Sequence, residues 1–149
     1  DPTPENDSHG EFIYLVAEVW RATRDEALLR EMWPHVVRAV AYMDELRTSE
    51  MTPNRATARR HLYGLMPPSI SHEGYSSRPA YSYWDDFWAL LGYKEAAELA
   101  AIVGDADAQR RMTASRDSFR RDLYASIGAM RRVHGIDFIP GAADLGDRP

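Results

Sequence analysis

The feature that most constrains this chain is a helix-joining turn that occurs twice, with an offset of 80 residues from Asp25 to Asp105. The segments TRDEAL at 23–28 and VGDADA at 103–108 each place an aspartate where it can cap the N-terminus of a helix. In both cases the preceding segment is apolar and aromatic, and the following one carries more charge. This repeat predicts two stacked, antiparallel helical hairpins whose first helices pack inward and whose second helices face water.

Apolar residues recur at spacings of three and four, and no stretch alternates with period two, so the sequence predicts an all-α fold. We expect helices at 10–24, around 28–32, at 33–47 with Pro34 in the first turn, and at 82–103, 106–124 and 126–133. Residues 48–61 are weakly helical. Ser8 and Glu11 form an expected capping box, and Gly104 and Gly135 are expected helix stops. Helices 10–24 and 82–103 should be neighbours, and more buried than 33–47 and 106–124.

Composition excludes several classes of protein. The net charge of -5 and the scattered basic residues disfavour a nucleic-acid partner, and no apolar run approaches the ~20 residues that span a bilayer. The absence of cysteine excludes a disulfide framework and thiolate metal sites. The histidines match no ligand motif, so we expect no metal and no cofactor. We expect a soluble chain, either cytoplasmic or exported with its leader absent.

The proline-punctuated segment from Leu62 to Trp88 gathers rings and acids in one loop and the helix start that follows it. Flat aromatic faces beside carboxylates are suited to a sugar, whose C–H faces stack on rings while its hydroxyls bond to acids. The alternative is that rings spaced i, i+3 and i+4 belong to a helix core. Asp85 and Asp86 would then lie in the first turn of that helix, where negative charge interacts favourably with the helix dipole. Trp20, Trp33 and Phe119 are expected core residues.

Two stretches carry a family resemblance: HGEFIYLVAEVWRATRDEALLREMWPHVVRAVAYMDELR at 9–47 and GLMPPSISHEGYSSRPAYSYWDDFWALLGYKEAAELAAIVGDADAQRRM at 64–112. They resemble the six-hairpin glycosidases, whose catalytic domains are (α/α)6 barrels. The resemblance implies that residues 1–149 are a fragment of one α/α-toroid catalytic domain, with about two and a half hairpins. It also implies that the remaining hairpins of the parent chain are its partners, and that an uncovered fragment exposes much apolar surface.

The resemblance further implies hydrolysis of an oligosaccharide or glycoside by paired carboxylates. Glu73 and Asp86 are the expected catalytic residues, although the stretch EGYSSR at 73–78 lacks the aspartate that trehalase-like relatives carry there. The expected sugar-binding residues are Tyr75, Arg78, Tyr83, Trp84, Asp85, His9 and Glu11. Both long connections precede inner helices, so the 1–11 segment and the aromatic loop should meet at one end of the array.

A purely structural role is an alternative explanation for several of these residues. Glu11 is also explained by helix capping, and Arg78 by an ordinary ion pair. For the whole chain, the alternative is a non-enzymatic α-helical repeat scaffold that binds a peptide or protein through the aromatic loop.

Overall fold

The computed structural model describes residues 5–70 and 78–146. Its long helices are α1 (Ser8–Thr23), α2 (Glu26–Ser49), α4 (Tyr83–Val103) and α5 (Ala106–His134). Between α2 and α4 lie the short helix α3 (Pro53–Thr57) and a 3₁₀ turn at Arg60–Leu62. Pairing between extended segments within the described ranges is limited to isolated bridges, such as Ser69 with Ala80. The prediction of an all-α fold is confirmed.

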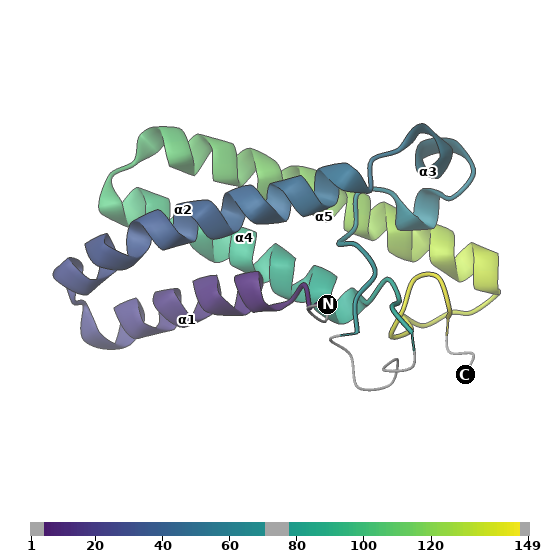
Figure 1. Ribbon diagram of the computed structural model, residues 1–149, viewed down its shortest axis with the longest axis horizontal. Coiled ribbons are helices and arrows are strands. Elements are labelled where there is room, and N and C mark those ends of the chain that lie inside the picture. The colour runs from purple at the N-terminus through teal and green to yellow at the C-terminus, as the bar shows by residue number, and fades with distance from the viewer. Residues whose placement is uncertain (1–4, 71–77, 147–149) are drawn as a thin grey trace.

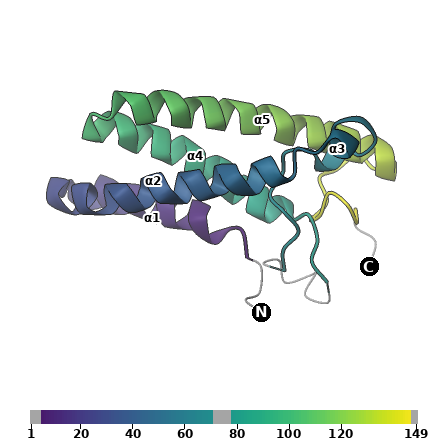
Figure 2. The ribbon, with the colours of Figure 1, turned by 45° about the horizontal axis from the view of Figure 1, so that its top comes forward.

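The long helices form two antiparallel hairpins, α1–α2 and α4–α5 (Figure 1). The tight turns of both hairpins lie at one end of the molecule. The N-terminal segment, the connection between α2 and α4, and the C-terminal segment lie at the other end (Figure 1). In the rotated view α4 lies between α5 and the α1–α2 pair (Figure 2), and it contacts all three of the other long helices. Within the described ranges no helix is long and apolar enough to cross a bilayer.

The repeated turn has the same construction in both hairpins. The Asp25 carboxylate accepts the N–H of Leu28 at 3.0 Å, and the Asp105 carboxylate accepts the N–H of Ala108 at 2.9 Å. The residue before each aspartate ends the first helix in a left-handed conformation, with φ of 53° at Arg24 and 80° at Gly104. The sequence repeat is therefore a structural repeat, and each aspartate satisfies a backbone donor that the helix leaves free.

Two predicted helix breaks are absent. Helix α2 continues through Pro34, which has no N–H to donate to the carbonyl of Arg30, so one helix spans Glu26–Ser49. Helix α5 continues through Ser126 to His134, and the separate helix expected at 126–133 is its last part. The described residues thus contain two long hairpins rather than two and a half.

The predicted capping box is also wrong. Helix α1 begins at Ser8, and its N-cap is Asp7, whose side chain does not bond to the helix end. The Asp7 carboxylate instead accepts a hydrogen bond from the indole of Trp84 on α4. A tertiary contact therefore takes the place of a local cap.

The two first helices, α1 and α4, were predicted to be more buried than α2 and α5, and this holds for α4 alone. Eleven of the 21 residues of α4 are buried, against six of 24 in α2 and seven of 29 in α5. Helix α1 is a neighbour of α4, as predicted, but only four of its 16 residues are buried. The greater burial expected for α1 is wrong, because among the described elements α1 packs only on α4 and α2, which leaves part of its surface exposed.

Candidate functional site

The N-terminal segment meets the connection between α2 and α4 at one end of the molecule. The side-chain amide of Asn6 donates to the carbonyl of Pro67 at 2.9 Å. The indole N–H of Trp84 donates to the Asp7 carboxylate, also at 2.9 Å. The prediction that both long connections gather at the same end is confirmed for the part of the chain that the structure describes.

Three rings from α1 and α4 form an aromatic platform, consisting of Tyr14, Trp84 and Trp88. The Trp84 and Trp88 rings meet edge to face with centroids 5.9 Å apart, and Tyr14 meets Trp88 in the same way at 5.7 Å. Trp84 is 47% exposed. Because its indole N–H is bonded to Asp7, the ring of Trp84 is held in one orientation while much of its surface faces solvent.

Two further predicted site residues lie on the first turn of α1. Glu11 is partly exposed, and partial burial raises its pKa, with the nearby charges of Asp7 and Glu5 adding to the effect. His9 packs its ring against Tyr42 of α2, with centroids 4.6 Å apart, and burial lowers its pKa. Glu11 therefore belongs to a group of acids beside the platform, whereas His9 packs toward α2.

Asp85 and Asp86 are fully buried, so neither reaches the surface near the platform. The Ser69 hydroxyl donates to Asp85, and the Met66 N–H donates to Oδ1 of Asp86 at 2.9 Å. Oδ2 of Asp86 has no hydrogen-bond partner among the described residues. Burial raises the pKa of Asp86 well above its usual value, and the neighbouring charge of Asp85 raises it further.

The other predicted site residues are divided between the interior, the surface and the part that is not described. Tyr83 is buried, and its hydroxyl bonds with the Ser126 hydroxyl at 2.8 Å. Arg78 is exposed. Glu73 and Tyr75 lie outside the described residues. Of the predicted set, the structure brings Trp84 and Glu11 to the same end, and it takes Tyr83, Asp85 and Asp86 into the core.

A segment near the C-terminus packs against the start of α4, and no pattern in the sequence predicts this contact. The carbonyl of Gly141 accepts the Tyr83 N–H at 3.0 Å, and the Ala143 N–H donates to the carbonyl of Tyr81 at 2.8 Å. The Asp144 carboxylate accepts the Tyr81 N–H at 3.1 Å. These bonds join residues about sixty positions apart in a segment rich in glycine, so no periodic pattern reveals them.

A second group of interacting residues that the sequence did not indicate is centred on Tyr81, which also bonds to the C-terminal segment. The Tyr81 hydroxyl donates to Glu50 and accepts from Arg55, each at 2.7 Å, and Arg55 also pairs with Glu50 at 2.9 Å. Burial, together with the hydrogen bond to Glu50, raises the pKa of Tyr81 to about 12. This network ties the end of α2 and helix α3 to the segment that leads into α4.

The platform was predicted only in part, because Trp84 was an expected sugar-binding residue whereas Tyr14 and Trp88 were not. The only sequence signal was the i, i+4 spacing of Trp84 and Trp88, which equally fits a helix core. Within the described residues, no group of three or more histidines and acids is arranged to hold a metal ion. Comparison with protein-family models, curated proteins and solved structures found no match to this chain.

Proposed function

We propose that this chain is part of the catalytic domain of a glycoside hydrolase and that the aromatic platform holds a sugar ring. One observation carries the proposal: the half-exposed Trp84 is fixed by Asp7 at the end where α1 and α4 begin. A pre-oriented indole face beside carboxylates has the apolar surface and the hydrogen-bond acceptors that a pyranose ring requires. The resemblance to six-hairpin glycosidases also implies a sugar site at the end of the molecule where α1 and α4 begin.

A general acid needs a raised pKa and access to the substrate, and Asp86 has only the first of these properties. Its raised pKa keeps the carboxyl protonated at higher pH than an ordinary aspartate, as proton donation to a leaving group requires. It lacks access, because the side chain is fully buried. We therefore propose sugar binding for the platform, and we treat the acid role of Asp86 and Glu73 as a separate hypothesis.

Sugar binding is tested by titrating the purified chain with a panel of oligosaccharides and following the tryptophan indole signals by NMR. We expect at least one saccharide to shift the Trp84 indole signal, and Trp84→Ala to weaken binding by roughly 10-fold or more, about 1.4 kcal/mol. Tyr124→Ala is the matched control, because Tyr124 is a 56% exposed ring on α5, a helix that contributes no ring to the platform. A panel without any binding, or equal losses in both variants, would reject the proposal.

The acid role needs an activity assay on a polypeptide that also carries the remaining hairpins implied by the resemblance. Glu73→Gln and Asp86→Asn should then be compared for turnover on the saccharide that binds. The general acid should lose ~10²–10⁴-fold in kcat, whereas a residue that only binds substrate should raise KM with kcat nearly unchanged. Unchanged kinetics in both variants would remove both residues from the reaction.

The alternative function is a non-enzymatic helical scaffold that binds a protein. The uncovered apolar face of α1 favours it, because such faces mark interaction sites. A chain that binds no saccharide but captures a protein partner through this face of α1 would support this alternative.

A further inference from the structure

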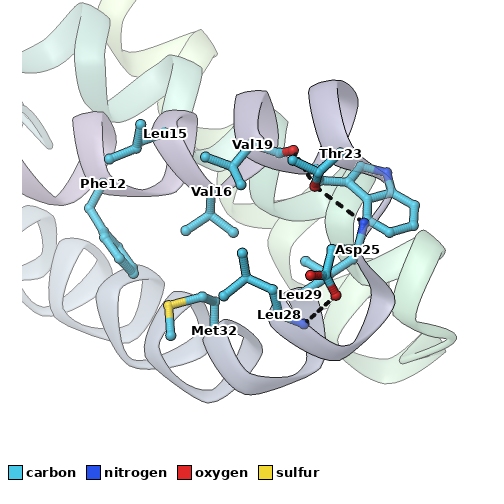
Figure 3. A pocket seen from close by; sticks show the side chains of 10 residues that line it. Phe12, Leu15, Val16, Val19, Thr23, Asp25, Leu28, Leu29 and Met32 are labelled. Atoms are coloured by element: carbon cyan, nitrogen blue, oxygen red, sulfur yellow. Dashed lines mark hydrogen bonds between the residues drawn. The ribbon is translucent and has the colours of Figure 1, made fainter.

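An apolar groove runs between α1 and α2 on the face that α4 and α5 leave open (Figure 3). Its lining is almost wholly hydrocarbon and includes Phe12, Leu15, Val19 and Trp20 from α1 and Leu28 and Met32 from α2. Leu15 is 60% exposed and Leu28 is 37% exposed. A continuous apolar surface of this kind is normally covered by another element.

The structural repeat identifies what covers such a face. Each groove position in the first hairpin has a counterpart 80 residues later, because the turns at Asp25 and Asp105 are equivalent. The counterparts of Val16, Val19, Trp20, Leu28 and Met32 are Ala96, Leu99, Ala100, Ala108 and Met112. All five counterparts are buried in the core that joins the second hairpin to the first. The groove is therefore the first hairpin's version of a face that the second hairpin uses for docking.

We propose that the α1/α2 groove is the docking face for a further helical hairpin, which precedes α1 in the same polypeptide. The order of the array supports this position, because the second hairpin uses this face to bind the hairpin that comes before it in the chain. The inference rests on the proposed function in one respect, namely that the chain is part of a larger helical domain.

The groove also limits how the additional hairpin approaches. Helix α1 comes close to α4 at Gly92, where a Cβ atom would lie 2.8 Å from the Cα of Gly10. The groove carries Phe12 at the position equivalent to Gly92. The additional helix therefore lies farther from α1 than α4 does, and it fills the space with larger apolar side chains.

A second copy of this chain fits the groove poorly. To continue the array, the copy would present its free α4/α5 edge, which includes Lys94, Arg116 and Arg120. The positions equivalent to Arg116 and Arg120 in the first hairpin are Val36 and Val40, which are buried in the existing interface. Placing arginines against a hydrocarbon groove would desolvate their charges without providing partners, which is costly.

The chain has no cysteine, so single introduced thiols report directly on the groove. Leu15→Cys and Leu28→Cys place a thiol in the groove, and Ala41→Cys places one at an exposed position of α2 as the control. In the 149-residue chain, all three thiols should react rapidly with a maleimide. In a polypeptide extended by the proposed hairpin before α1, we expect the two groove thiols to react at least ~10²-fold more slowly, because reaction then requires local opening. The control thiol at position 41 should react with the maleimide equally fast in both polypeptides.

Three results would overturn the proposal: equally fast groove thiols in the longer polypeptide, a gene that encodes no helical pair before α1, or concentration-dependent protection in the short chain. The last result would assign the groove to a second copy. Thiol protection is measured without any saccharide, so its outcome is separate from the proposed function. If the groove thiols are protected in a protein that binds no sugar, the docking proposal is supported and the proposed glycoside hydrolase function is contradicted.

Discussion

The backbone of Gly10 on α1 lies directly against the carbonyl group of Trp88 on α4. A Cβ atom on Gly10 would come within 2.2 Å of that oxygen, so only glycine allows the two helices to cross here. Since the same crossing brings α1 next to the platform, the contact between these two residues supports both the core and the candidate site.

We expect Gly10→Ala to destabilise the fold by ~1–3 kcal/mol, because the added methyl group forces the helices apart. Gly128→Ala is the control, since a Cβ at that helical position would meet only the end of Arg132 at 3.7 Å. That change should be neutral or stabilising by up to ~1 kcal/mol from helix propensity. Urea denaturation compares the two free energies of unfolding, and equal effects would contradict the close crossing.

Asp86 should make stability depend on pH. Its pKa is higher in the folded protein than in the unfolded chain, so the folded state retains the proton longer. Its contribution to stability is therefore complete below about pH 4 and is lost as pH rises through the raised folded value. Asp86→Asn keeps an acceptor for Met66 but cannot ionise.

Relative to wild type, Asp86→Asn should gain stability as pH rises above about 4, on top of a constant offset. Chemical denaturation at a series of pH values measures this difference. Asp107→Asn is the control, because Asp107 is largely exposed in a surface ion pair. Parallel stability curves for Asp86→Asn and wild type would show that Asp86 ionises normally in the fold.

Removal of Arg47 should cost far more than removal of a surface arginine. Arg47 is buried, and it donates to the carbonyl of Gly64 at 3.1 Å and to Asp122 at 2.9 Å. Arg47→Ala leaves a largely buried carboxylate without this partner, so we expect a loss of ~3–5 kcal/mol. Arg110→Ala, in an exposed pair with Asp107, should cost less than ~1 kcal/mol. Thermal and urea unfolding give both values, and a small effect at Arg47 would show that Arg60 alone suffices for Asp122.

Tyr81→Phe should weaken the junction between α2 and α4. The variant loses a hydroxyl that bridges Glu50 and Arg55, so we expect a loss of ~1–3 kcal/mol, in the range of hydrogen bonds to charged groups. Tyr124→Phe removes a hydroxyl from an exposed ring and serves as the matched control. Indistinguishable unfolding midpoints for the two variants would mean that Glu50 and Arg55 hold the junction without Tyr81.

Local sequence chemistry was sufficient to predict the two hairpins. An aspartate cap acts on a backbone N–H three residues away, and Gly104 and Gly135 adopt the left-handed conformation that ends a helix, so both signals act within a single turn. The turn at Asp25 and the ends of α4 and α5 therefore matched the prediction. The apolar periodicity of 82–103 also identified α4 within one residue of its observed start.

Only tertiary structure decided which side chains are available to a ligand. Tyr83, Trp84, Asp85 and Asp86 follow one another along a single turn, yet only Trp84 faces solvent. The other three are held by Ser126, Ser69 and Met66, partners from 16 to 43 residues away. Neither the spacing nor the residue types of this turn reveal those partners. Burial depends on what packs against each side of a helix, and a local pattern carries no record of which distant segment that is.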